Sequence, residues 1–474
     1  MKKRIWISVS LIVAILINIV FSYFLINNQA FKMLYQKYAD LPKSDMQIGE
    51  VTIDQPYFQT HQLELTDLVA PYQLIIKNEG KYYHAYQSQV LQEVHKLTDE
   101  PITVLVDNQP QIDPIQLDEI MGEDHIQFIY LTKISLLLLE DMVEIPEGAS
   151  TQFKVNRVIL PVEKPGKVYF VDSVNKSFLE GRIRRSIDIE QLFAAIATGS
   201  ADRIEMAEYE INRDTVYLPK ESLASPSQVY SLEKVPENYF IDPVFEGANF
   251  DITQPDLNNV RSYHTYNSSL MIDDDTNIMT VNHHNNQING LLRSEEDLVT
   301  QKDLVTQKDL LQKSLELAER FNYWGEDVRV FSEQNNQLIL RRFLAGMPIF
   351  SDPTLPDYGA SKLRFTSQRS QLKLEKLQMS LVILGVNISD LSSPQLVESG
   401  AEIAELLEEQ NLKFSKFNQV ILGFEWQKDM ENFKKVNLVP KWFFVVGTQV
   451  YSIDQLKDGS LRIMLQQRDA RTNA

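Results

Sequence analysis

The chain has 474 residues, a formal net charge of −19 at pH 7 and no cysteine. A chain of this length favours two to four domains, and its hydrophobic content of 43% excludes a disordered protein. The acidic excess argues against a protein that binds nucleic acid or anionic lipid headgroups, and the absence of cysteine excludes thiol chemistry and cysteine-ligated metal sites.

An uncharged apolar run, Ile5–Ile26, follows the basic residues Lys2, Lys3 and Arg4. As a helix the run extends for about 33 Å, which is enough to cross a membrane core of about 30 Å. The preceding positive charges predict a cytoplasmic N-terminus. We therefore predict that residues 1–28 form a cytoplasmic tail and a single transmembrane helix, with the remaining chain extracytoplasmic. A cleaved signal peptide is the alternative, but the apolar core is long for one and no good cleavage site follows it.

Small and polar residues recur within this run at a spacing of four, namely Ser10, Ala14, Asn18 and Ser22. That spacing places them in one sector of a helix, where they predict a contact with the transmembrane helices of partner proteins. The alternative is that any anchor tolerates them, since serines in spans often bond their own backbone.

Residues 29–171 alternate strand-like and helix-like segments, which predicts an extracytoplasmic α/β domain. Asn78–Gly80 predicts a three-residue hairpin loop between two of the strands. The predicted helices are Gln29–Tyr38 and Gln87–Leu97, and the predicted strands are Tyr72–Lys77, Lys81–Tyr86, Ile102–Val106, Phe128–Leu139, Phe153–Leu160 and Lys167–Val171.

Residues 172–293 predict a middle domain. Its helix, Ile187–Thr198, ends at Gly199 as the C-cap, and the acidic segment Asp273–Thr276 predicts a hairpin turn. The predicted strands are Ile204–Leu218, Gln228–Leu232, Ser269–Ile272 and Asn277–Val281, and a polar tract, His283–Asn289, follows them.

Residues 294–474 predict a C-terminal domain with a helix packed on an antiparallel sheet. It begins with a tandem repeat, Asp297–Lys302 and Asp303–Lys308, which we interpret as a local duplication at the start of a helix, because solenoids repeat every 20–50 residues. The predicted helices are Asp309–Phe321 and Ser393–Gln410, the latter with Ser393 as N-cap and Pro394 as its first residue. The predicted strands are Val328–Phe331, Gln337–Phe343, Leu374–Leu384, Gln419–Trp426, Trp442–Tyr451 and Leu461–Leu465. The fold class is thus α+β: one transmembrane helix and three mixed domains with largely antiparallel sheets.

The sequence contains no strong catalytic motif, and we expect no catalytic, cofactor-binding or metal-binding residues. Ser173 and Lys176 match the S-x-x-K pattern of penicillin-recognising enzymes, but the partner motifs do not follow in the right order. Asp273–Asp275 lacks the spacing of a calcium loop, so a solvated turn is the better interpretation. His283 and His284 point to opposite sides of any regular strand and cannot share a metal from one.

Four segments carry a family resemblance: Tyr239–Phe245 (YFIDPVF), Ser269–Val281 (SLMIDDDTNIMTV), Gln419–Trp426 (QVILGFEW) and Leu438–Trp442 (LVPKW). Together with an N-terminal apolar span preceded by Lys and Arg, and with the absence of cysteine, their order resembles the YycH family. These are membrane-anchored extracytoplasmic regulators of the WalK/YycG sensor histidine kinase in low-GC Gram-positive bacteria. The last part of the chain resembles the companion protein YycI as well.

The resemblance implies a non-enzymatic protein that binds the kinase and a YycI-like protein and modulates a two-component system controlling cell-wall metabolism. It implies no cofactor and a location in the cell membrane. Two other readings stay open from the residues alone. One is an extracytoplasmic enzyme acting on the cell wall, and the other is an adhesion or scaffold protein.

Overall fold

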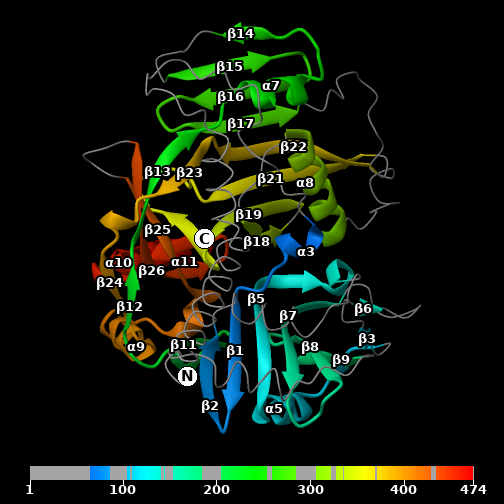
Figure 1. Cartoon of the computed structure of the whole chain (residues 1–474), viewed down its shortest axis with the longest axis vertical. Helices are drawn as coiled ribbons and strands as arrows, with labels where there is room; N and C mark the ends of the chain where they lie inside the picture. The colour runs from blue at the N-terminus through cyan, green and yellow to red at the C-terminus, as the bar shows by residue number, and fades with distance from the viewer. Residues whose placement is uncertain are drawn as a thin grey trace, which may run out of the picture. The chain divides into compact units, whose positions relative to one another are not determined.

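The structure, a computed structural model, describes residues 64–85, 104–106, 109–139, 143–144, 153–183, 204–253, 259–283, 306–321, 327–334, 336–368, 371–428 and 434–472. All of them fall within one unit, Phe58–Ala474. The described strands form an 11-stranded sheet, a 14-stranded sheet and a two-stranded ribbon (Figure 1). The predicted α+β class with largely antiparallel sheets is confirmed for this part of the chain.

The 11-stranded sheet has the order β11-β10-β2-β1-β5-β7-β8-β9-β3-β6, and β4 pairs with β9. Its strands are β1 (Gln73–Asn78), β2 (Lys81–Ala85), β3 (Val104–Val106), β4 (Gln111–Ile112), β5 (His125–Ser135), β6 (Val143–Glu144), β7 (Lys154–Pro161), β8 (Lys167–Asp172), β9 (Ser177–Ile183), β10 (Ile204–Ile211) and β11 (Asp214–Pro219). The short helices α3 (Leu65–Leu68), α5 (Pro114–Gly122) and η1 (Leu136–Leu139) accompany it.

The strands predicted before Asp172 are confirmed with small shifts of their ends. The single strand predicted over Ile204–Leu218 is wrong, because a turn at Asn212 and Arg213, both with positive φ, divides it into β10 and β11. The predicted Phe128–Leu139 strand becomes β5 followed by the 3-10 helix η1. The predicted three-residue loop is wrong, because Asn78 pairs with Lys81 and leaves only Glu79 and Gly80 in the turn. Both turn residues have positive φ, at 52° and 76°, as a two-residue hairpin turn requires.

The 14-stranded sheet follows the order β14-β15-β16-β17-β22-β21-β19-β20-β25-β26-β13-β23, with β18 on β19 and β27 on β26. Its strands are β13 (Gln228–Lys234), β14 (Asp251–Thr253), β15 (Val260–His264), β16 (Ser268–Asp273), β17 (Ile278–His283), β18 (Val328–Gln334), β19 (Gln337–Leu344), β20 (Met347–Ser351), β21 (Ala360–Gln368), β22 (Gln371–Ser380), β23 (Val382–Asn387), β25 (Gln419–Lys428), β26 (Lys435–Val446) and β27 (Gln449–Ser452). The ribbon pairs β12 (Leu223–Pro226) with β24 (Pro394–Val397).

The predicted strand Leu374–Leu384 is two strands, β22 and β23, separated by Leu381 alone. Strand β22 pairs with β17 and β21, whereas β23 pairs with β13. The strand order runs from β22 through β21, β19, β20, β25, β26 and β13 to β23. Because β23 directly follows β22 along the chain, this part of the sheet closes on itself. An apolar cluster that includes Ile349, Phe424 and Trp426 fills this closed part of the sheet.

The helices described between residues 238 and 472 are α7 (Asn238–Phe245), α8 (Gln307–Phe321), α9 (Gly400–Glu409), α10 (Ile453–Lys457) and α11 (Ser460–Thr472), with the 3-10 turns η3 (Ser389–Leu391) and η4 (Phe414–Lys416). In Figure 1, α7 and α8 lie over strands β15 to β22, and their contacts with β16 and β22 place them on the sheet. Their apolar residues share one large core cluster with residues of the 11-stranded sheet. The predicted helix Asp309–Phe321 is confirmed as α8.

Three element predictions near the C-terminus are wrong. The single strand predicted over Trp442–Tyr451 is the end of β26 and most of β27, which pair as a hairpin around a turn at Gly447 and Thr448. The helix predicted over Ser393–Gln410 begins only at Gly400, because Pro394–Val397 pairs with β12 as strand β24. Ser399, not Ser393, is the N-cap, and it forms a capping box with Glu402. The strand predicted over Leu461–Leu465 is helix α11, since these two leucines, four residues apart, are both buried on one helix face.

Several predictions fall outside the described residues. They are the anchor Ile5–Ile26, the helices Gln29–Tyr38, Gln87–Leu97 and Ile187–Thr198, and the first copy of the tandem repeat. Within the described part of the chain, no helix is both long enough and apolar enough to cross a membrane. The second repeat copy does lead into a helix, since Thr306 and Asp309 exchange hydrogen bonds at the start of α8. The domain boundaries at 171 and 293 remain predictions.

Candidate functional site

Two of the segments that carry the resemblance meet on the 14-stranded sheet. Tyr239–Phe245 forms most of α7, and Ser269–Val281 forms the β16–β17 hairpin. Phe240, Val244 and Phe245 of the helix share a buried apolar cluster with Leu270 and Ile272 of the hairpin, among others. The pairing of helix and hairpin brings the β13–α7 connection close to the acidic turn of the hairpin.

The acidic turn is ordered by hydrogen bonds among its own residues, which the side chain and the carbonyl of Asp273 accept. Asp273 accepts hydrogen bonds from the backbone N–H groups of Asp275 and Thr276, both at 3.0 Å. Asn277 adopts φ of 55° and donates its N–H to the Asp273 carbonyl at 2.7 Å. The turn is a hairpin turn, as the sequence predicts, and it directs the Asp274 carboxylate toward β15.

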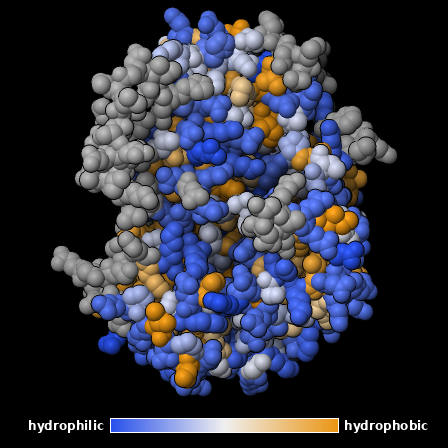
Figure 2. Space-filling model, turned by 180° about the vertical axis from the view of Figure 1, so that it is seen from behind, coloured by the Kyte–Doolittle hydropathy of each residue, from blue (hydrophilic) through white to orange (hydrophobic). Residues whose placement is uncertain are grey.

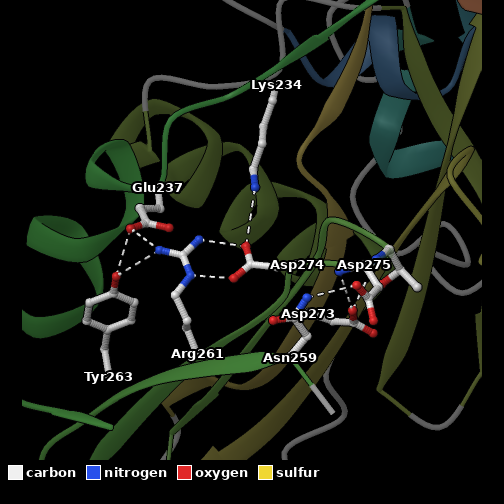
Figure 3. A network of polar contacts seen from close by, with 9 residues as sticks. Lys234, Glu237, Asn259, Arg261, Tyr263, Asp273, Asp274 and Asp275 are labelled. Atoms are coloured by element: carbon white, nitrogen blue, oxygen red, sulfur yellow. Dashed lines mark hydrogen bonds and ion pairs between the residues drawn. The ribbon is translucent and has the colours of Figure 1, made fainter. Parts of the chain in front are cut away.

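Arg261 of β15 is the centre of a charge network at this turn (Figure 3). Its Nε and Nη2 donate to the two carboxylate oxygens of Asp274 at 2.6 and 2.7 Å. Its Nη1 donates to Glu237 at 2.6 Å, and the Tyr263 hydroxyl donates to the same Glu237 oxygen at 2.7 Å. Lys234, at the end of β13, lies 3.5 Å from Asp274. The network ties the segment before α7 to strands β15 and β16.

The charges of this network compensate one another. The hydrogen bond from Arg261 lowers the pKa of Asp274, and those from Asp274 and Glu237 raise the pKa of Arg261. Burial, followed by the hydrogen bond to Glu237, raises the pKa of the Tyr263 hydroxyl. A carboxylate held ionised by an arginine is a poor general base, because its proton affinity is reduced. The arrangement is suited to fixing α7 on the sheet.

The other two segments pair directly as neighbouring strands. Gln419–Trp426 lies in β25 and Leu438–Trp442 in β26, with Trp426 opposite Leu438 and Gly423 opposite Lys441. A Cβ atom at Gly423 would lie 2.6 Å from the Pro348 carbonyl oxygen of β20. The glycine therefore permits the close parallel approach of β20 to β25.

A second charge cluster lies on the β25–β26 ladder. Lys441 Nζ lies 2.5 Å from the carboxylate of Glu425, which is 2% exposed, and it also contacts Asp454 of α10. Burial opposes the charge of Lys441, but the hydrogen bonds to Asp454 and Glu425 outweigh it and raise the pKa. This lysine thus stays charged and connects the strand pair to the C-terminal helices.

The residues of the S-x-x-K match and of the histidine pair take part in local hydrogen bonds. Ser173 is buried, and its hydroxyl accepts a hydrogen bond from Asn156 at 2.7 Å in the turn between β8 and β9. His283 Nδ1 lies 2.8 Å from the Ser268 hydroxyl, while His284 lies outside the described residues. Among the residues that the structure describes, no cluster of His, Asp or Glu could hold a metal ion.

The predicted transmembrane contact residues Ser10, Ala14, Asn18 and Ser22 also lie outside the described residues, so the predicted contact remains a prediction. The sequence did indicate the acidic turn. It did not indicate Arg261, Glu237 or Tyr263, because β15 was not predicted. A strand at Val260–His264 paired with β16 would have placed Arg261 beside the turn.

One family model matches about half of the chain. The family model described as YycH protein, C-terminal domain, matches residues 213–459. The chain is similar to the crystal structure of YycH from Bacillus subtilis, with 14% sequence identity and a TM-score of 0.64, over 82% of this chain and 97% of that chain. An uncharacterized protein from Eubacterium rectale ATCC 33656 shows 8% identity and a TM-score of 0.30, over 52% of this chain and 88% of that chain. The first of these similarities indicates a shared fold, and no curated protein matches the chain.

Proposed function

Because the chain belongs to the YycH family, we propose that it is a non-enzymatic regulator that binds and modulates a WalK/YycG-like sensor histidine kinase. In this proposal it acts with a YycI-like protein in a two-component system that controls cell-wall metabolism. It is anchored in the cell membrane by one span, with the N-terminus in the cytoplasm and the bulk of the chain extracytoplasmic.

The observation that carries the proposal is the family match over residues 213–459. The matched range contains both places where the resemblance segments meet, namely the Arg261 network and the β25–β26 ladder. These places are built from paired charges and packed apolar side chains. Such features hold elements together, and they support a binding protein better than an enzyme.

The partner contact that we propose within the membrane is the face formed by Ser10, Ala14, Asn18 and Ser22. Helices in lipid associate through close approach at small residues and through polar side chains that bond across the contact. Asn18 lies near the middle of the predicted span, where a hydrogen bond between helices contributes roughly 0.6–2 kcal/mol. The spans of the kinase and of the YycI-like protein are the proposed occupants of this face.

The proposal is tested by affinity capture of the full chain from native membranes followed by mass spectrometry. We expect the kinase and a YycI-like protein among the captured proteins. The variant Asn18→Leu with Ser10→Ile and Ser22→Ile keeps the span apolar but removes the polar face, and it should lose the kinase at an unchanged membrane level. Val13→Leu with Val20→Leu, on the opposite face, is the matched control and should retain it.

Two outcomes would contradict the proposal. Absence of any sensor kinase from the captured proteins would remove its central partner. Clearing of peptidoglycan in a zymogram by the purified chain, lost in Ser173→Ala, would favour the enzyme reading instead. If both span variants retain the kinase equally, the span is only an anchor and the contact lies elsewhere.

A further inference from the structure

The β21–β22 hairpin is basic, although the chain as a whole carries a net charge of −19. Its two strands contain Lys362, Arg364, Lys373 and Lys376 and a single acidic residue, Glu375. Arg364, Lys373 and Lys376 are exposed, and Lys362 is partly exposed. The basic face, as we name these four residues, therefore carries a local positive charge on a chain whose net charge is negative.

The strand register directs all four cations to the same side of the sheet. Lys362 and Arg364 alternate with the buried residues Leu363 and Phe365, and Arg364 lies opposite Lys376. The buried side chains belong to the core cluster that α8 contributes to, so the cations point away from that helix. Figure 2 views the molecule from behind relative to Figure 1, and its upper part is predominantly hydrophilic.

A bulge in β22 is what places Lys373 on this side. Residues three apart on a regular strand face opposite sides, so Lys373 and Lys376 would normally diverge. The register shifts between Arg364 and Phe365, where Arg364 pairs with Lys376 but Phe365 pairs with Leu374. The extra residue, Glu375, restores both lysines to the outer side. Bulges that re-aim side chains in this way are often functional features.

The charge of the basic face is only partly compensated within the described residues. Glu375 lies 3.9 Å from Arg364, and these two side chains are 38% and 52% exposed. At physiological salt a charge is screened within about 8 Å. Asp357, which is paired with Arg341, also attracts Lys362. The acidic excess of the whole chain argues against attraction to an anionic surface at a distance, but at contact distance a ligand responds mainly to the local positive charge of the basic face.

We propose that the basic face docks on the anionic lipid headgroups of the membrane in which the chain is anchored. The inference rests on the membrane anchorage in the proposed function, which keeps the described part of the chain close to a lipid surface. Four long side chains that project to the same side of two adjacent strands can reach one plane together. Headgroup phosphates present their charge in such a plane.

The neighbouring strand supports a hydrated contact of this kind. On the same side of the sheet, Thr280 pairs with Gln378 and Asn282 pairs with Lys376. These partly exposed hydroxyl and amide groups can hydrogen-bond to phosphate and glycerol oxygens. The basic face thus orients the ectodomain without inserting into the bilayer.

The test uses the full chain reconstituted in vesicles of phosphatidylcholine alone or of phosphatidylcholine mixed with phosphatidylglycerol. Amine-reactive labelling of individual lysines is followed by mass spectrometry. We expect Lys362, Lys373 and Lys376 to react at least about fivefold more slowly in the anionic vesicles, because headgroups cover their amines in the docked state and the four basic residues together favour that state. The difference should vanish at about 1 M salt, where the Debye length is about 3 Å.

A pair of variants with equal net charge separates the local patch from the overall charge. Lys373→Gln with Lys376→Gln should abolish the slower labelling of Lys362 in anionic vesicles. The matched control, Lys81→Gln with Lys413→Gln, removes two exposed lysines elsewhere and should preserve it. All four substitutions lie at exposed positions, so the fold is retained.

Equal labelling of the three lysines in the two lipid mixtures would overturn the proposal. Protection of these lysines only after another membrane protein is added would overturn it as well, because the face would then bind that protein. Either result would leave the proposed function intact if the kinase is still captured. Release of the chain from both kinds of vesicle by an alkaline wash would contradict the anchor and the docking together.

Discussion

Two arginine–aspartate–tyrosine groups, one in each sheet, use the same chemistry at different depths. Arg157 of β7 is 1% exposed and donates to Asp214 of β11 at 2.6 Å, with its guanidinium 5.7 Å from the Tyr217 ring. Arg261 is 26% exposed and binds Asp274 and Glu237 at the sheet margin. The depth of burial decides what each group contributes.

The buried group connects strands that are not neighbours in the sheet. Strands β7 and β11 are separated by four others in the strand order, yet Arg157 reaches Asp214 and the Tyr217 hydroxyl donates to Gln127 of β5 at 3.3 Å. The 11-stranded sheet must therefore curl across its own face. Burial lowers the pKa of Arg157, but Asp214 and Tyr217 outweigh it and the pKa is raised.

The same type of ion pair stabilises a sheet in one place and fixes a helix in the other. A charge buried without its partner is costly, because neither water nor another charge replaces the lost interaction. A charge at the sheet margin keeps access to water, so loss of its partner is screened. The Arg157 group thus holds the curled sheet closed, whereas the Arg261 group clamps α7 and can open without disturbing the rest of the sheet.

The largest expected effect follows from removing the buried carboxylate. Asp214→Asn leaves Arg157 charged and buried, and it should lower the opening free energy of β7 and β11 by about 3 kcal/mol. Native-state hydrogen exchange of the amides in these strands measures that free energy. A double variant, Asp214→Asn with Arg157→Met, removes the unpaired buried charge and should recover part of the lost opening free energy. Equal exchange in wild type and Asp214→Asn would show that the pair does not hold the curl.

A smaller effect is expected at the sheet margin. Asp274→Asn removes the bidentate partner of Arg261 but leaves Glu237, so the opening free energy of α7 should fall by about 1 kcal/mol. Amides of β7 and β11 should be unaffected. The control Asp275→Asn changes an exposed residue of the same turn and should alter α7 little. A loss as large as that of Asp214→Asn would end the distinction between the two groups.

The same clamp should respond to acid. Arg261 lowers the pKa of Asp274, so the contribution of the pair is complete above the ordinary carboxyl pKa of about 4 and is lost as pH falls through the depressed value. The difference in α7 opening free energy between wild type and Asp274→Asn should therefore shrink and disappear as the pH is lowered from about 4 into the more acidic range. A difference that stays constant over this range would assign the effect to packing.

The smallest effect concerns the start of α9. Ser399→Ala removes the N-cap and should lower the opening free energy of this helix by about 1 kcal/mol. Ser393→Ala is the matched control, because Ser393 belongs to the β12–β24 ribbon, where its hydroxyl contacts Ser227. Exchange of the α9 amides should change only in the first variant. The reverse result would restore the helix start that the sequence suggested.

Apolar residues in short runs or in alternation with polar ones predicted most strands, since most strands have a face in a core. Strands β4 and β14, which are exposed along their whole length, gave no such signal. The errors arose where two signals competed. Ser393-Pro394 resembles a helix start. However, Pro394 begins the strand that pairs with β12, and the helix begins later, after the capping box at Ser399. Leu461–Leu465 is too short for its periodicity to be read with certainty, and contact with α10 makes it a helix.

The candidate site was predictable only in part. The acidic turn at Asp273–Thr276 is a local feature and was found, whereas the partners of Asp274 come from β13, β15 and the start of α7. The contact between Arg157 and Asp214 likewise cannot be predicted from local sequence, because it depends on five successive strand pairings across the curled sheet. Side chains that meet through sheet register cannot be inferred from neighbours along the chain.

The proposed modulation of a sensor histidine kinase by this chain can be measured directly. Its most direct test is the autophosphorylation rate of the kinase captured with the chain, reconstituted in vesicles with and without the full chain and a YycI-like protein. The account predicts that the rate changes at least about twofold when they are present, which corresponds to about 0.4 kcal/mol at the activation barrier, and that the Asn18→Leu, Ser10→Ile, Ser22→Ile variant reduces the change. An identical rate in all preparations, with the proteins verified in the same vesicles, would contradict it.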